Sequence, residues 1–138
     1  MAQLFQEKSK QLYERLISEG RSDVNILNNL SWLYLKTGDL SRALELGEEA
    51  ITLAPNSTAV QSTLGAIYFE LSNYDEASSL LERSVNNSTA YSKDTYLMLV
   101  ESLVKVGEKD KAKQYLDKLS DEAKGASNEL DRLSELVN

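Results

Sequence analysis

The sequence of 138 residues contains no histidine and no cysteine. A serine or cysteine nucleophile therefore has no imidazole to activate it, and zinc sites built from thiolates or imidazoles are excluded, as are disulfides. Without cysteine, the composition is compatible with any redox compartment, so it leaves the localisation open. These absences favour a chain that is not an enzyme and that has no cofactor and no metal site.

Residues that form turns are also scarce, because the chain has one proline, Pro55, and six glycines. Strands need frequent turns, so this scarcity favours long helices joined by short links. The hydrophobic fraction of 41% and the charged fraction of 27% are typical of a soluble globular protein. The length fits one domain.

Positive charge is in deficit, with 15 lysines and arginines against 22 acidic residues and a net charge of −7. Binding to nucleic acid requires clustered cations, so we expect no nucleic-acid partner. No apolar run approaches the roughly 20 residues that span a bilayer, and the first residues lack the apolar core of a secretion signal. We expect no membrane insertion by these residues.

What the chain does contain is a repeat, in which three similar clusters follow one another at intervals of 34 and 35 residues. An alanine stands nine residues after the end of each cluster, and a break lies between cluster and alanine. The clusters are Leu27-x2-Leu30-Ser31-x2-Tyr34, Gln61-x2-Leu64-Gly65-x2-Tyr68 and Tyr96-x2-Leu99-Val100-x2-Leu103, and the alanines are Ala43, Ala77 and Ala112. The same internal spacing in three copies indicates one structural unit used repeatedly.

Spacings of three, four and seven place the apolar residues of each cluster on one face of a helix. The small residues Ser31 and Gly65, together with the three alanines, let a second helix approach closely. We predict a left-handed helix end at each break, at Gly38, Asn73 and Gly107. Ser57 and Ser92 are the predicted caps of the helices that follow them.

The repeat divides the chain into one domain with five parts. Residues 1–23 are the second helix of a partial repeat, three repeats occupy 24–57, 58–92 and 93–126, and residues 127–138 are a partial repeat or a capping helix. Half-copies at both ends indicate an excerpt from a longer array, and a native closing helix is the alternative for the last part.

The repeat resembles the tetratricopeptide repeat, whose pattern is W-x2-L-G-x2-Y followed by A-x3-F and then A and P. The residues that match are Leu30, Ser31, Tyr34, Ala43, Ala50 and Pro55 in the first copy, Leu64, Gly65, Tyr68 and Ala77 in the second, and Leu99, Ala112 and Leu116 in the third. Gly47 stands where the family has a large apolar residue, and Trp32 is not at the tryptophan position of the family. The resemblance implies an all-α fold, a right-handed superhelix of antiparallel helix pairs.

The resemblance also implies that first helices line a concave groove, with their second, fifth, ninth and twelfth residues pointing into it. The candidate residues for partner binding are Asn25, Asn28, Trp32 and Leu35, then Ala59, Ser62, Ala66 and Phe69, then Asp94, Leu97, Glu101 and Val104. The aromatic and aliphatic members have core packing as their alternative role. For Asn25 the alternative is a polar position at a helix start.

From this groove we expect a non-catalytic interaction module or scaffold that binds a peptide or helix of a partner protein. Clamping of a chaperone's C-terminal carboxylate is excluded, since the corresponding positions lack cations: Asn28, Trp32, Thr63, Asp94 and Leu97. The third copy leans acidic, and Asp131 and Glu135 continue the trend. This acidic character of the groove positions predicts a basic or amphipathic partner segment. The alternative is an acidic surface that is only solvated.

Two other functions stay open from the sequence. The half-copies at the ends are compatible with a structural segment that forms a homo-oligomer through its end helices. The chain is also compatible with the regulatory arm of a larger enzyme. The sequence does not identify a partner.

Overall fold

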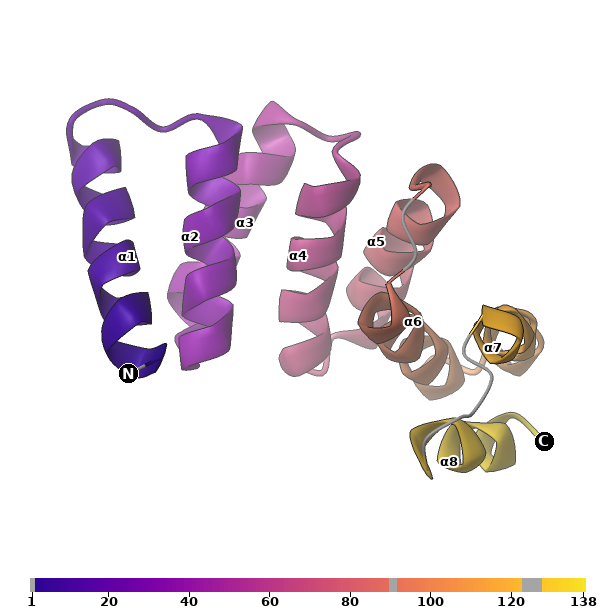
Figure 1. Cartoon of the computed structure of the whole chain (residues 1–138). Coiled ribbons are helices and arrows are strands. Elements are labelled where there is room, and N and C mark those ends of the chain that lie inside the picture. The colour runs from indigo at the N-terminus through magenta and orange to yellow at the C-terminus, as the bar shows by residue number, and fades with distance from the viewer. Residues whose placement is uncertain (1, 90–91, 123–127) are drawn as a thin grey trace.

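The computed structural model of the chain describes residues 2–89, 92–122 and 128–138 (Figure 1). All regular secondary structure in these ranges is helical, as the repeat predicts. The helices are α1 (Ala2–Ser18), α2 (Val24–Thr37), α3 (Leu40–Leu53), α4 (Thr58–Glu70), α5 (Tyr74–Asn87), α6 (Lys93–Lys105), α7 (Lys109–Glu122) and α8 (Asn128–Val137). Within these ranges, no helix combines the length and the apolar character that crossing a bilayer requires.

The helices follow one another in a row, each packed against the next, so that the molecule extends from α1 to α8 (Figure 1). Helices α2, α4, α6 and α8 also contact one another in sequence, which places them side by side on one face of the stack. The intervening helices α3, α5 and α7 cover the opposite side. The chain is therefore a solenoid of helix pairs, as the sequence predicts.

Short polar side chains begin the first helices of the pairs. The Asp23 carboxylate accepts a 3.0 Å hydrogen bond from the backbone N–H of Ile26 at the start of α2. The Ser57 hydroxyl caps α4 and the Ser92 hydroxyl caps α6 in the same way. Both serine caps were predicted, and each satisfies a backbone donor that the first turn of a helix leaves unpaired.

The breaks inside the pairs contain one residue each in the left-handed conformation. Gly38 has φ 90° and Gly107 has φ 86°, as predicted. The prediction for Asn73 is wrong, because the left-handed residue in the middle pair is Ser72, with φ 59°. The repeat accounts for the difference, since Ser72 stands 34 residues after Gly38, and Asn73 is the residue that precedes α5. The place in the repeat thus determines which residue is left-handed, and it outweighs the usual preference of asparagine for this conformation.

Small residues set the distance between the two helices of each pair. Ala43, Ala77 and Ala112 are fully buried. The buried Ser31 hydroxyl donates a 2.7 Å hydrogen bond to the carbonyl oxygen of Ala43, which ties α2 to α3. At Gly65, a Cβ atom would stand 2.8 Å from the Leu81 side chain, so α4 and α5 approach as closely as glycine permits.

A candidate partner-binding groove

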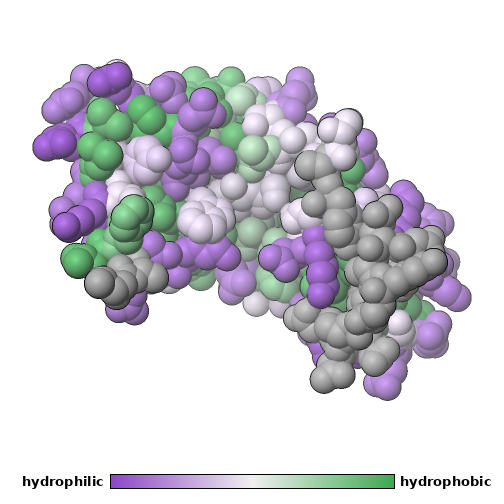
Figure 2. All heavy atoms as spheres, viewed as in Figure 1, coloured by the Kyte–Doolittle hydropathy of each residue, from purple (hydrophilic) through white to green (hydrophobic). Residues whose placement is uncertain are grey.

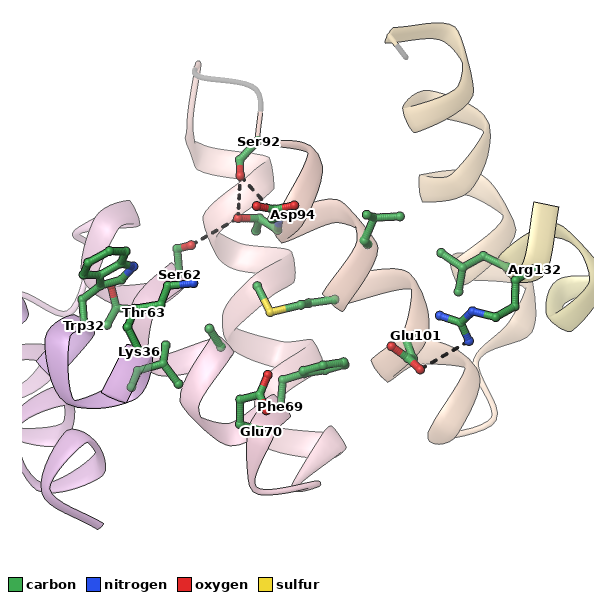
Figure 3. A pocket seen from close by; sticks show the side chains of 16 residues that line it. Trp32, Lys36, Ser62, Thr63, Phe69, Glu70, Ser92, Asp94, Glu101 and Arg132 are labelled. Carbon is green, nitrogen blue, oxygen red and sulfur yellow. Dashed lines mark hydrogen bonds and ion pairs between the residues drawn. The ribbon is translucent and has the colours of Figure 1, made fainter. Parts of the chain in front are cut away.

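A hollow of about 610 Å³ runs along the face formed by α2, α4, α6 and α8 (Figure 3). Its lining comprises Trp32, Leu35, Lys36, Ser62, Thr63, Ala66, Phe69, Glu70, Ser92, Asp94, Thr95, Leu97, Met98, Glu101, Arg132 and Leu133. Each of the four helices thus contributes side chains to one continuous surface. We call this surface the groove.

Small and hydroxyl side chains occupy the middle of the groove. The Ser62 hydroxyl of α4 and the Thr95 hydroxyl of α6 are 3.3 Å apart, and Thr95 also lies 3.1 Å from the Ser92 hydroxyl. Ala66 follows Ser62 one turn later on α4. These short side chains keep α4 and α6 close together and leave the space between the larger residues on either side open (Figure 3).

The apolar side chains of the groove differ in exposure. Trp32 is 44% exposed, so it is a surface residue and not part of the core. Phe69 is half-buried and meets the Tyr74 ring edge to face at 5.8 Å between centroids. Leu35 is half-buried beside a cluster of core residues. Leu35 and Phe69 therefore pack against core residues and also line the groove, and partner binding by these positions stays a prediction.

Charges of both signs line the groove. Its cations are Lys36 and Arg132, and its carboxylates are Glu70, Asp94 and Glu101. Arg132 forms an ion pair with Glu101 at 3.6 Å, whereas neither Asp94 nor Glu70 has an ion pair within the part of the chain that the structure describes. The groove therefore carries an excess of one negative charge, and its two unpaired carboxylates come from α4 and α6.

The Lys36 ammonium is 5.3 Å from the centre of the Trp32 ring. A cation at this distance is attracted by the face of the indole. The contact holds Lys36 over the ring that is otherwise the most exposed apolar surface of the groove. Among the described residues, no group of acidic side chains is arranged to hold a metal ion.

The structure brings most of the predicted residues together in the groove: Trp32, Leu35, Ser62, Ala66, Phe69, Asp94, Leu97 and Glu101. Val104 instead packs, half-buried, against the core cluster around α6 and α7. Asn25 is exposed at the start of α2 and is absent from the lining. The side chain of Asp131 lies outside the described residues.

Sequence reasoning missed several groove residues, above all the cation Lys36. Lys36 follows Trp32 by four residues, and Glu70 and Met98 follow Ala66 and Asp94 by the same interval. Residues four apart are neighbours on a helix surface, so extending each predicted position by one turn would have found all three. Arg132 and Leu133 of α8 complete the groove at its other end.

A second hollow, of about 350 Å³, lies beside the groove among α1, α2 and α4. Trp32 and Thr63 line both hollows, and Asn28 lines only the second. One end of the Asn28 carboxamide is buried there with no hydrogen-bond partner among the described residues. A buried polar atom of this kind is stabilised by a group that supplies the missing bond.

The surface of this face is of intermediate hydropathy. Figure 2 shows mainly pale spheres in the middle of the view, over α2 and α4, with hydrophilic side chains around them.

Comparison with known proteins identifies the repeat. A family model described as tetratricopeptide repeat matches residues 34–89. The interferon-induced protein with tetratricopeptide repeats 2 of Cricetulus griseus is 30% identical over 63 residues, which are 46% of this chain. The chain spans 14% of the length of that relative.

Solved structures of similar fold cover most of the chain. The MamA protein superposes with a TM-score of 0.76 and 20% identity over 99% of this chain and 82% of MamA. The protein YrrB, described as a TPR protein with an unusual peptide-binding site, gives 0.70 and 24% over 79% of this chain and 56% of YrrB. PilF of Pseudomonas aeruginosa gives 0.75 and 17% over 96% and 61%. At these identities the likeness concerns the fold.

Proposed function

We propose that this chain, which belongs to the tetratricopeptide-repeat family, binds an amphipathic peptide or helix of a partner protein in the groove of α2, α4, α6 and α8. Repeats of this family are scaffolds for protein–protein interaction, and the family generally acts without catalysis. The observation that supports this site most is the continuous lining, to which all four first helices contribute.

The exposed Trp32 ring is the main anchor in this proposal. A tryptophan with 44% of its surface exposed exchanges much water-facing apolar area for contact when a partner covers it. Phe69 and Leu97 lie along the same hollow on the next two first helices. An apolar stripe on the partner would contact these three side chains in turn, as the apolar face of a bound helix does.

The charges of the groove favour basic groups on the partner. Asp94 of α6 and Glu70 of α4 have no ion pair among the described residues, and both line the groove. A lysine or arginine on the partner would pair with either carboxylate in a partly dry site. Lys36 repels the same groups at the Trp32 end, so basic residues are expected toward α6 and not toward α2.

The buried end of the Asn28 carboxamide adds a polar requirement. A partner segment that crosses Trp32 into the second hollow would place its backbone near Asn28. A backbone amide offers both a donor and an acceptor, so it would complete the missing bond whichever way the carboxamide is turned. The side-chain oxygen of Asn28 stays without a hydrogen-bond partner when a segment occupies only the larger hollow.

A library of random peptides displayed on phage and selected on the 138-residue chain tests this function. We expect enriched sequences to carry aromatic or aliphatic residues at helical or alternating spacing, with a lysine or arginine on one side. Binding should weaken on Trp32→Ala and on Phe69→Ala by tenfold or more, roughly the 1.4 kcal/mol of a modest anchor residue.

Leu53→Ala is the matched control, because Leu53 is 56% exposed and lies on α3, away from the groove. Binding should be unchanged in this variant. Peptides that bind Trp32→Ala and Phe69→Ala as tightly as the unaltered chain would contradict the groove as the binding site.

A further inference from the structure

The second hollow, among α1, α2 and α4, is polar and neutral. Among the described residues, its lining includes no charged side chain. The polar members are Ser9, Tyr13, Asn28, Asn29 and Thr63. Its volume of about 350 Å³ lies at the small end of the roughly 300–1,000 Å³ of ligand pockets. A group that enters this hollow therefore meets hydrogen-bonding atoms and no opposite charge.

The Thr63 hydroxyl of α4 is a polar group that the fold leaves without a partner. The side chain is 8% exposed and lines both hollows (Figure 3). Its hydroxyl forms no hydrogen bond with any described residue, whereas the Thr37 hydroxyl of α2 donates to the carbonyl oxygen of Leu33 at 3.0 Å. Buried hydroxyls are normally hydrogen-bonded, so the place of Thr63 in the lining favours a ligand that supplies the bond.

The Tyr13 hydroxyl of α1 offers a donor to the same hollow. It accepts a 3.4 Å contact from the Asn29 carboxamide. Its own proton has no acceptor among the described residues, in contrast to Tyr34 and Tyr68, which donate to glutamates. A phenolic hydroxyl both donates and accepts, so Tyr13 can still donate to a ligand.

We propose that the second hollow receives a glutamine or asparagine side chain of the partner segment. Tyr13 donates to the carbonyl oxygen of this side chain, and the Thr63 hydroxyl accepts from its amino group. The proposal rests on the proposed function, because the segment that crosses Trp32 carries the side chain. The backbone of that segment pairs with the buried end of the Asn28 carboxamide, which leaves Tyr13 and Thr63 for the side chain.

Other side chains match this lining less well. Lysine and arginine have no acceptor for the Tyr13 proton. An aspartate or glutamate would lie in the hollow without a cation in the lining, a cost that a carboxamide of the same shape avoids. An aliphatic side chain would leave the hydroxyls of Tyr13 and Thr63 unpaired and shielded from water.

The place of this hollow determines the order of side chains on the partner. Trp32 lines both hollows, and the second hollow extends from it toward α1. The unpaired Asp94 belongs to α6, on the other side of α4. The partner segment should therefore carry its carboxamide at one end, its apolar stripe in the middle and its basic residue toward the other end.

Selection of a random peptide library on phage tests the assignment with two targets. One is the unaltered chain, and the other carries Thr63→Val and Tyr13→Phe, which remove both hydroxyls and keep the shapes of the side chains. Peptides selected on the unaltered chain should share a glutamine or asparagine, separated from the basic residue by the apolar stripe. Peptides selected on the double variant should lose the carboxamide and keep the apolar and basic residues.

The affinity of one selected peptide gives the size of the effect. Replacing its carboxamide residue by leucine, or by the acid of the same shape, should weaken binding to the unaltered chain about tenfold or more, because the two hydroxyls lose their partner. The same replacements should matter much less on the double variant, and a double-mutant cycle measures this coupling.

Thr52→Val is the matched control, since Thr52 is exposed on α3 and lines neither hollow. Binding should be unchanged in this variant. Tyr13→Phe and Thr63→Val are also measured singly, and circular dichroism of each variant verifies that the helices are intact.

Three results would overturn the carboxamide site and leave the proposed function standing. Peptides that require Trp32 and bind equally well with leucine would remove the preference. Equal binding of the acidic peptide would show that the hollow accepts a charge. Equal weakening of every peptide by Thr63→Val and Tyr13→Phe would assign the hydroxyls to the peptide backbone. Peptides that bind Trp32→Ala and Phe69→Ala as tightly as the unaltered chain would instead contradict the proposed function itself.

Discussion

The Tyr68 hydroxyl of α4 donates a 2.8 Å hydrogen bond to the Glu48 carboxylate of α3. The same bond occurs 34 residues earlier, where Tyr34 of α2 donates to Glu14 of α1 at 3.3 Å. Each bond joins a first helix to the second helix that precedes it. The repeat therefore reproduces a polar link between successive pairs in addition to the apolar packing within them.

The next glutamate in this series, Glu82 of α5, accepts from a different donor. Leu103 occupies the tyrosine position, and Glu82 accepts instead from Tyr115 of α7 at 2.9 Å. Lys111 also reaches Glu82, at 3.3 Å. Glu14, Glu48 and Glu82, which stand at intervals of 34 residues, thus each anchor a neighbouring helix, although the partner residue varies.

Replacing Tyr68 by phenylalanine should destabilise the chain by about 1 kcal/mol, the net contribution of a typical hydrogen bond in a protein. The ring of Tyr68 remains in its half-buried place, so packing is preserved. Urea unfolding followed by circular dichroism measures the change. Tyr13→Phe is the control with little expected loss, since its hydroxyl accepts only a 3.4 Å contact from Asn29. Equal losses in both variants would contradict the role of the Glu48 bond.

Stability should fall as the pH rises from about 10 to 12. Burial raises the pKa of Tyr68 to about 12, and the hydrogen bond to Glu48 and the charges of Glu48 and Glu76 add to the shift. Below pH 10 the hydroxyl keeps its proton in both the folded and the unfolded chain. Above it, the unfolded chain releases that proton first, so unfolding is favoured until the folded pKa is passed.

The ultraviolet absorbance of tyrosinate, recorded with unfolding curves across this range, measures the alkaline effect. Burial also raises the pKa values of Tyr34 and Tyr115, so these two groups contribute in the same direction. Tyr68→Phe should lose part of the dependence. A slope of stability with pH that is unchanged in that variant would contradict the assignment to Tyr68.

Much of the fold follows from the sequence because the repeat supplies three independent copies of each position. Ser57 and Ser92 were predicted as the caps of the helices that follow them, and both accept the expected backbone N–H. Asn73 failed as a left-handed residue because its residue type was weighed above its register with Gly38. Positions compared across copies were therefore more informative than single-residue preferences.

The groove was predictable in outline and less so in its charge. Family geometry gives four positions per helix, whereas the lining includes the next turn as well, where Lys36 stands. Val104 was predicted for the groove, but it is absent from the lining and packs against the core cluster around α6 and α7. Arg132 pairs with Glu101 across two helices, and the contact of such distant residues depends on how the pairs stack.

Gly65→Ala should destabilise the chain by about 1–3 kcal/mol through overpacking, even though alanine is the better helix former. Its Cβ would stand 2.8 Å from two atoms of Leu81, which is buried and cannot move away. Gly47→Ala should cost less, because its Cβ would meet the end of the Leu64 side chain at 3.0 Å. Thermal unfolding ranks the two variants, and a larger loss for Gly47→Ala would contradict the packing described.

Arg42→Met should loosen α1 without affecting α5. Arg42 of α3 donates hydrogen bonds to both oxygens of the Glu14 carboxylate, at 2.8 and 3.0 Å, and so ties α1 to the stack. The pair is partly exposed, so its contribution to global stability should be about 1 kcal/mol or less. Hydrogen exchange should accelerate in residues 2–18 and stay unchanged in α5. Uniform acceleration along the chain would show that α1 does not open by itself.

The most direct test of the groove is nuclear magnetic resonance of the labelled chain, titrated with a peptide from the library selection. The Trp32 indole and the amides of α2, α4 and α6 should shift most, whereas α3, α5 and α7 should change little on their outer surface. Shifts that concentrate on α3, α5 and α7, with the Trp32 indole unmoved, would contradict binding in the groove.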